Sequence, residues 1–450
     1  MHGRHTLDSK FSETNTQVPH LWTGSIKLQH PGKFRRAPLL FSHGGSMSAE
    51  PSTAELRAMH ILLASLLMLL YGVDRTHCFL SELEHATGNE TDKLALLDFK
   101  KATLDPNGAL RSWNTTTPYC QWSGVSCSRR PNHPDRVTAL YLANLGLSGP
   151  IPASLGNLSF LSNLTLSTNY FSGGLPPLNR LRRLQVVDLR NNQLQSTMSD
   201  AVTNLPPDNL VALDLSENFI TGEVPSSLGL LFKKLFFVQL ANNALTGSIP
   251  PNLKNASQLK FLNLANNNLT GSIPSELGEL SSMLYLFLGG NMLSGGIPGT
   301  LFNMSSLAIL DVAVNMLGGV MEFPPYIRFS PILSAINMSQ NLFEGDIPPA
   351  LGNASNLIML DMSQNKFTGQ IPASLGNLEA LTYLNLGENN LEARDSQSWE
   401  FIDKLSQCRS LEQLHLDAND LQGDIPDTIG NLSTMVICDL SYNNLQGPIP

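Results

Sequence analysis

The chain has 450 residues, of which 42% are apolar, 7% are aromatic and only 14% are charged, well below the usual quarter or so. Its 28 basic and 37 acidic residues give a formal net charge of −9, which argues against a nucleic-acid partner held by a basic surface. Because the 34 glycines and 28 prolines recur at fixed positions rather than in tracts, the composition also disfavours a disordered or collagen-like chain.

Residues 1–58 are basic and aperiodic, and we expect a disordered leader or a start codon assigned too far upstream. Residues 61–73 form an uncharged apolar run, short for a membrane span of about 20 residues but typical of a signal peptide. We therefore expect a signal peptide and its cleavage zone over residues 59–78, with a signal anchor as the alternative. The true start would be Met47 or Met59, and Met47 is favoured because it leaves Arg57 ahead of the apolar run.

Residues 87–134 are predicted to form a cap ahead of a repeated region. A short amphipathic helix is expected over Asp92–Ala102, with Thr91 as its N-cap. The segment LALLDFKKATLDPNGALRSWN, followed by CQWSGVSC, resembles the N-terminal cap of plant leucine-rich-repeat receptor kinases nearly position for position. A small lid on an open repeat stack benefits from a disulfide, and we expect one between Cys120 and Cys127. A metal or redox site at these cysteines is disfavoured by their spacing and by the lack of His partners.

From residue 135 to the end, one pattern, LxLxxN, repeats with a modal period of 24 residues. The first Leu-like residue of each copy defines an anchor. The anchors are Leu140, Leu164, Val187, Leu213, Val238, Leu262, Leu286, Leu310, Ile336, Leu360, Leu384, Leu414 and Cys438. Asn lies five residues after the anchor in twelve of these thirteen copies, and Gly lies nine residues after it in eleven.

Each repeated position has a physical reason. The LxL alternation is a short strand with one buried face, Asn can bond the backbone where the chain turns, and Gly tolerates turn geometry. No unit can bury its own leucines, so the units stack into an α/β leucine-rich-repeat solenoid. The longer consensus, clearest in Leu357–Asn377, resembles the plant-type subclass. That resemblance implies a right-handed superhelical stack of about 13 repeats with a short parallel concave sheet and a second short strand in each unit.

Ten Asn-x-Ser/Thr sequons favour the secretory pathway, and five of them share one slot on the outer side of the unit. That slot contains Asn157, Asn255, Asn303, Asn353 and Asn431. The other five sequons are Asn89, Asn114, Asn163, Asn268 and Asn337.

The sequence shows no P-loop, no G-x-S-x-G elbow, no H-E-x-x-H and no kinase motif, so we expect no enzyme, cofactor or metal site in this segment. Only His415 among the histidines lies on a predicted strand, where it is expected to be solvated. Cys438 is at an anchor and should point into the core, whereas Cys408 lies on another stripe, so we expect no bond between them.

Outward strand positions line the concave surface, and a ligand is predicted to bind there. The expected contacts are Phe237, Phe261, Tyr285, Phe287 and Asp311, because the four aromatic residues would form an exposed stripe over three coils. The alternative is that this column only braces neighbouring coils. Glycans at Asn163 and Asn337 would obstruct the surface on either side, leaving the window between Val187 and Leu310 free.

Aspartates recur directly after the anchor, at Asp188, Asp214, Asp311, Asp361 and Asp439. They would favour a basic or amine-bearing ligand, with Arg190 the only cation in these columns, or they are consensus filler. A 30-residue unit, which includes Trp399 and Cys408, breaks the pattern and resembles an enlarged unit in receptor kinases that perceive microbial molecules. It is interpreted as a longer convex helix, with a lateral docking loop as the alternative.

The resemblance implies the extracellular ligand-recognition domain of a leucine-rich-repeat receptor-like kinase. Such a domain would bind a peptide or microbial ligand and a co-receptor ectodomain at the outer face of the plasma membrane. The pattern stops mid-repeat at Pro450, so we expect a truncated chain whose membrane span and kinase are missing. The main alternative is a protein secreted to the cell wall, such as an inhibitor of pathogen wall-degrading hydrolases. An intracellular scaffold is disfavoured by the cap cysteines and the sequons.

Overall fold

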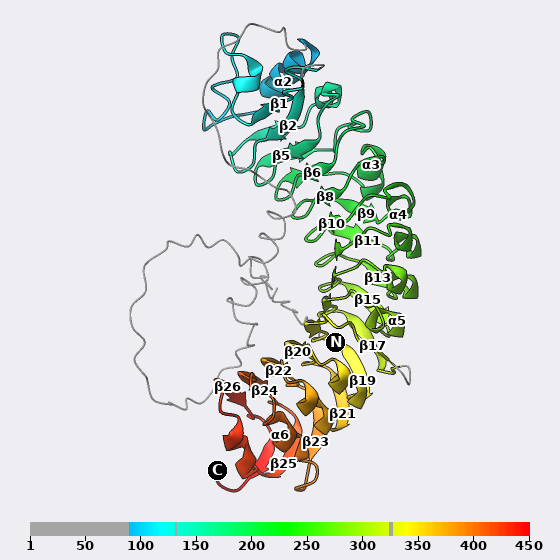
Figure 1. The fold of residues 1–450 in the computed structure, drawn as a ribbon, viewed down its shortest axis with the longest axis vertical. Coiled ribbons are helices and arrows are strands. Elements are labelled where there is room, and N and C mark those ends of the chain that lie inside the picture. The colour runs from blue at the N-terminus through cyan, green and yellow to red at the C-terminus, as the bar shows by residue number, and fades with distance from the viewer. Residues whose placement is uncertain (1–89, 131–132, 324–326) are drawn as a thin grey trace, which may run out of the picture. The chain divides into compact units, whose positions relative to one another are not determined.

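The computed structural model describes residues 90–130, 133–323 and 327–450. The expected leader (1–58) and signal-peptide region (59–78) lie outside this part of the chain. From α2 (Glu90–Ala102) onward, the coils follow one another in chain order, as the colours of Figure 1 show. Among the described residues, no helix is both long and apolar enough to cross a membrane.

One side of the coils is a 14-stranded sheet, and each predicted anchor lies within one of its strands. The strands are β1 (Val125–Cys127), β2 (Val137–Tyr141), β4 (Asn163–Thr165), β6 (Val186–Asp188), β8 (Ala212–Asp214), β10 (Phe237–Gln239), β12 (Phe261–Asn263), β14 (Tyr285–Phe287), β16 (Ile309–Asp311), β18 (Ala335–Asn337), β20 (Met359–Asp361), β22 (Tyr383–Asn385), β24 (Gln413–His415) and β26 (Ile437–Asp439). Among the strands that the structure describes, only β1 and β2 pair antiparallel. The parallel strands pair anchor to anchor, as Val238 does with Leu262, so equivalent side chains form straight columns.

The asparagines five residues after the anchors bond the backbone where the chain turns, as predicted, and together they form a ladder, which Asn341 illustrates. Its Nδ2 donates to the carbonyl oxygens of Met338 and Ser339 in its own turn and of Val312 in the preceding coil, at 3.0–3.1 Å. Its Oδ1 accepts the backbone N–H of Leu317 at 3.0 Å, also from the preceding coil. Each buried amide therefore joins two successive coils where both leave the sheet.

Second strands run along a different side of the coils, as the plant-type consensus implies. They form a three-stranded, a two-stranded and an eight-stranded sheet. Their bounds are β3 (Ser148–Pro150), β5 (Tyr170–Gly173), β7 (Gln193–Leu194), β9 (Thr221–Glu223), β11 (Ala244–Thr246), β13 (Thr270–Gly271), β15 (Met292–Gly295), β17 (Met316–Val320), β19 (Leu342–Asp346), β21 (Lys366–Gln370), β23 (Asn390–Ala393), β25 (Asp420–Asp424) and β27 (Asn444–Gln446). The repeated glycine of these strands has a positive φ, such as +75° at Gly345, which disfavours a side chain there.

Short helices close most of the coils on the side away from the 14-stranded sheet. They are η2 (Ala153–Asn157), α3 (Met198–Thr203), α4 (Ser227–Leu231), η3 (Pro251–Asn255), η4 (Ser275–Glu279), α5 (Gly299–Phe302), η5 (Pro349–Asn353), η6 (Ala373–Asn377), α6 (Glu400–Leu405) and η7 (Asp427–Asn431). The enlarged unit contains a convex helix, α6, as predicted, but with six residues it is no longer than α3. Trp399, which precedes α6, is buried and donates Nε1–H to the carbonyl of Gln422 at 3.0 Å.

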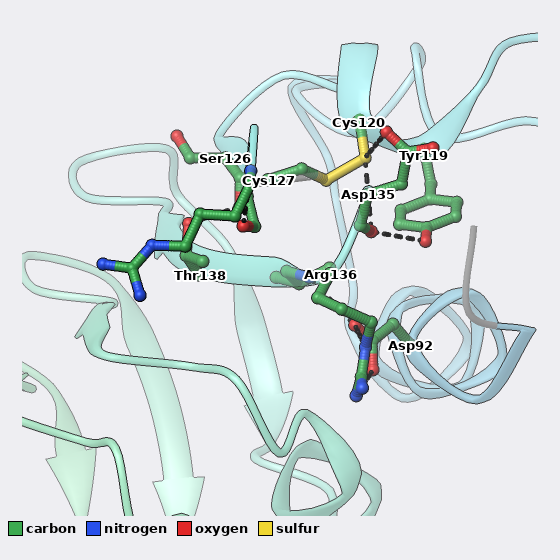
Figure 2. The surroundings of a disulfide bond; sticks show 11 residues. Asp92, Tyr119, Cys120, Ser126, Cys127, Asp135, Arg136 and Thr138 are labelled. Atoms are coloured by element: carbon green, nitrogen blue, oxygen red, sulfur yellow. Dashed lines mark hydrogen bonds and ion pairs between the residues drawn. A yellow bond between two sulfur atoms is a disulfide. The ribbon is translucent and has the colours of Figure 1, made fainter. Parts of the chain in front are cut away.

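The cap covers the first coil with α2, η1 (Tyr119–Gln121) and β1. The predicted disulfide between Cys120 and Cys127 is confirmed, with 5.5 Å between the two Cα atoms. Figure 2 shows how Arg136 lies against Asp92 of α2, whose carboxylate is fully buried. Two 2.9 Å bonds from the guanidinium and one from the Val137 N–H compensate the loss of water around that carboxylate.

Three details differ from the sequence-based expectations. Helix α2 begins at Glu90, so Thr91 lies in its first turn and is not the N-cap. Cys438 is exposed rather than part of the core, and both it and the buried Cys408 are free thiols. His415 is only 7% exposed and therefore is not solvated.

Candidate ligand-binding surface

Residues one before, one after and three after each anchor point out of the 14-stranded sheet, and we call this surface the sheet face. In-register pairing places Phe237, Phe261 and Tyr285 side by side on β10, β12 and β14. Phe287, two residues beyond Tyr285 on β14, pairs with Asn263 and Asp311 of its neighbours. The structure thus brings together all five residues predicted to contact a ligand.

The aromatic rings of this group pack on one another. The Phe237 and Phe261 rings are stacked, with centroids 4.5 Å apart. Phe261 also meets Phe287 at 5.6 Å and Tyr285 at 6.2 Å, both in tilted arrangements. Such contacts add about 0.5–1.5 kcal/mol per pair beyond the burial of apolar area.

The expected exposure of this aromatic stripe was therefore wrong for its three phenylalanines. Phe237, Phe261 and Phe287 are 7%, 4% and 6% exposed, and only Tyr285 is half-buried. Stacking across strands about 4.8 Å apart removes most of each ring from water. The cluster braces β10, β12 and β14, as the alternative interpretation held, and of its four aromatic side chains Tyr285 is the one that a ligand could reach most readily.

The aspartates after the anchors have a local structural role that the sequence did not show. Asp214 Oδ1 accepts the N–H of Ser216 at 3.0 Å and its hydroxyl at 2.6 Å. Asp311 Oδ1 accepts the N–H of Ala313 at 3.0 Å. Asp361 makes the same pair of bonds to Ser363. Each carboxylate satisfies the backbone where the chain turns off the strand.

Burial changes the acidity of these groups. It raises the pKa of Asp214 to about 7, with a further contribution from the charge of Asp188 in the adjacent coil. Burial also raises the pKa of Asp311 to about 6, against the lowering effect of its bond from Ala313. Arg190 lies 3.9 Å from Asp188 and only partly opposes the rise in the pKa of Asp188 that burial causes. This stretch of the sheet face therefore gains or loses negative charge over mildly acidic to neutral pH.

Two sequons lie on the sheet itself, as predicted. Asn163 begins β4 and Asn337 ends β18, and both are half-buried. The convex sequons differ, because Asn157, Asn353 and Asn431 are exposed at the last residue of a short helix. The strands from β6 to β16 carry no sequon on the sheet face.

Two family models match this chain, one over the cap and one over four of the repeats. The model of the leucine-rich-repeat N-terminal domain matches residues 89–128. The leucine-rich-repeat model matches residues 209–231, 258–280, 356–378 and 410–432. The described part of the chain is therefore a leucine-rich-repeat solenoid with a leucine-rich-repeat N-terminal domain.

Several of the proteins it resembles are receptor kinases or their ectodomains. This leucine-rich-repeat protein is 46% identical over 100 residues to the LRR receptor-like serine/threonine-protein kinase EFR of Arabidopsis thaliana, a match that covers 22% of the chain and 9% of EFR. Among solved structures, PEPR1–AtPEP1 is 35% identical with a TM-score of 0.72, over 80% of this chain and 49% of that one. The plant peptide hormone receptor RGFR1 in complex with RGF2 is 28% identical with a TM-score of 0.52, over 67% and 55% of the two chains. The matched part is thus 9% of EFR and about half of each receptor structure.

Proposed function

We propose that this chain is the ligand-recognition part of the extracellular domain of a leucine-rich-repeat receptor-like kinase. It binds a peptide or microbial ligand on the sheet face and associates with a co-receptor ectodomain. The observation that carries the proposal is the likeness to PEPR1–AtPEP1 over 80% of the chain at 35% identity. RGFR1, a plant peptide hormone receptor of similar fold, was solved in complex with RGF2, which supports a peptide as the class of ligand.

The ligand is placed on the strands between Asn163 and Asn337. Four features of that window support the placement: straight in-register columns, the packed aromatic cluster, the half-buried Tyr285 and the neighbouring Asp311. A rigid cluster loses little side-chain entropy when a partner binds to it, which favours affinity. The carboxylates favour a ligand with basic or amine groups.

Selection from a displayed random-peptide library on the full chain tests this placement. We expect Tyr285→Ala to weaken binding of the selected peptides at least tenfold, since partly exposed tyrosines are frequent hot spots. Phe287→Ala should act in the same direction. Tyr170→Ala is the matched control, because Tyr170 is 58% exposed on β5, away from the sheet face. Unchanged affinity in both Tyr285→Ala and Phe287→Ala would contradict the placement.

We further propose that the chain enters the secretory pathway and faces the outside of the plasma membrane. The disulfide in the cap and the exposed sequons at the ends of convex helices support an oxidising, glycosylating route. Mass spectrometry of the secreted chain should find glycans at Asn157, Asn353 and Asn431. A chain that stays unglycosylated with a reduced Cys120 would contradict this part of the proposal.

The membrane anchorage is tested by sequencing the full-length transcript across both ends of this chain. A reading frame that continues past Pro450 into an apolar span and a kinase supports the receptor. A frame that closes with a cysteine-paired cap and a stop codon supports a secreted binding protein instead.

A further inference from the structure

A histidine and two aspartates meet on the sheet face near β26, outside the window proposed for the ligand. His415 on β24 is the register partner of Asp439 on β26. Asp417 follows His415 by two residues, at the outward position three after the anchor. One imidazole nitrogen and one carboxylate oxygen from each aspartate all lie within 4.8 Å of one another.

The imidazole supplies a second and independent observation. His415 is 7% exposed, and its Nε2 is buried without a hydrogen-bond partner in the described chain. Its ring lies 5.7 Å from the ring of Tyr383 on the neighbouring strand β22. A buried ring nitrogen without a protein partner is unfavourable, and a metal ion is a ligand that would satisfy it.

The carboxylates of Asp417 and Asp439 would be stabilised by a positive charge between them. Their ligand oxygen atoms lie within 4.8 Å of each other, so the two negative charges repel at close range. A bound divalent cation would reverse the repulsion between the two carboxylates.

The absence of a side chain at Gly387 leaves space for the carboxylate of Asp417. A Cβ atom built on Gly387 would lie 2.5 Å from Asp417 Oδ1, too close for the carboxylate to stay in place. Because Gly387 does not have a positive φ, its backbone conformation does not itself require glycine. The absent side chain therefore gives the Asp417 carboxylate its position.

We propose that His415, Asp417 and Asp439 form a binding site for a divalent transition-metal cation such as Zn²⁺. One imidazole and two carboxylates are ligands that this class of ion accepts, and three protein ligands leave a coordination position open. Ligand atoms of a tetrahedral zinc ion lie about 3.3 Å apart. Closing from 4.8 Å requires rotation of the aspartate side chains, and both aspartates are only half-buried.

Calorimetric titration of the full chain with ZnCl₂ tests the site. Eight of the ten histidines precede residue 90 and could bind Zn²⁺ independently of this site. The difference in binding between the wild type and the variants is therefore the informative measurement, rather than the total number of bound ions. We expect the wild type to bind one more Zn²⁺ than His415→Gln. Asp417→Asn should weaken that site at least tenfold, and Zn²⁺ should raise the Tm of the wild type more than that of either variant.

Two glycine variants separate a metal site from a general effect on the fold. Gly387→Ala should weaken Zn²⁺ binding at least tenfold by displacing Asp417. Gly289→Ala, the equivalent change four coils earlier, should leave it unchanged. If His415→Gln does not fold, Asp417→Asn and Gly387→Ala decide the question. Equal stoichiometry and affinity in the wild type, Asp417→Asn and Gly387→Ala would overturn the proposal.

Discussion

Replacing a ladder asparagine tests what joins one coil to the next, and Asn291 is well suited to it. Its Nδ2 donates to the carbonyls of Leu264 and Leu288 at 3.0 Å and of Gly289 at 3.3 Å. Its Oδ1 accepts the Leu269 N–H at 3.0 Å. Asn291→Ala removes all four bonds from a position that is 9% exposed.

The loss of stability in Asn291→Ala depends on which of the backbone groups bonded to Asn291 keep another hydrogen bond. The three carbonyls retain bonds from Asn267, from Asn315 and from the Asn266 N–H. Only the Leu269 N–H is left without one. An orphaned buried N–H costs about 1–3 kcal/mol, and losing the three shared bonds adds to it, so we expect a loss of about 3 kcal/mol. Asn291→Asp should be worse at neutral pH, because it turns a carboxylate oxygen toward three carbonyl oxygens.

Hydrogen exchange followed by mass spectrometry is the appropriate assay, because coils of a solenoid open locally. A loss of about 3 kcal/mol corresponds to roughly hundredfold faster exchange. We expect it in the coils on either side of Asn291, with the distant cap unchanged. Met292→Ala, at an adjacent and 40% exposed side chain, is the control. Exchange in Asn291→Ala no faster than in Met292→Ala would refute the role of the ladder.

Three other predictions follow from single features of the structure. Burial raises the pKa of Asp214 in the folded chain to about 7, so the stability that its protonated form contributes is largest below about pH 4 and is lost as the pH rises through 7. Asp214→Asn should therefore flatten the dependence of Tm on pH. Above pH 7 this variant should be more stable than the wild type by up to about 4 kcal/mol. Loss of the disulfide in Cys120→Ser/Cys127→Ser should destabilise the cap by about 2 kcal/mol, seen as faster tryptic cleavage at the exposed Arg129, and equal cleavage rates would contradict it. Val314 has a φ of +55°, which is strained for a β-branched residue, so Val314→Asn should raise stability by about 1 kcal/mol in urea unfolding, and a lower midpoint would be the contrary result.

The sequence was enough to predict the solenoid because its determinants are local and repeated. The anchors, the ladder asparagines and the turn glycines recur at one period, so each copy supports the interpretation of the others. The disulfide between Cys120 and Cys127 and the helix of the enlarged unit were predictable for a similar reason, because both belong to recognisable local patterns.

The side-chain environment on the sheet was harder to predict, because it depends on residues in neighbouring coils. The 24-residue spacing puts Phe237 beside Phe261, but the stacking that buries both rings depends on side-chain orientation. The buried pair of Asp92 and Arg136 joins residues 44 apart and follows no repeat. The partners of His415 include Asp439, from the following coil, so its sequence neighbourhood alone indicated only a polar strand residue.

The proposed function depends on ligand recognition by the sheet face between Asn163 and Asn337. Hydrogen-exchange footprinting of the full chain, with and without a peptide selected on it, tests this most directly. We predict that bound peptide slows exchange in β10, β12, β14 and β16 and leaves the convex helices η3, η4 and η5 unchanged. Protection confined to those helices, with the four strands unaffected, would contradict the account.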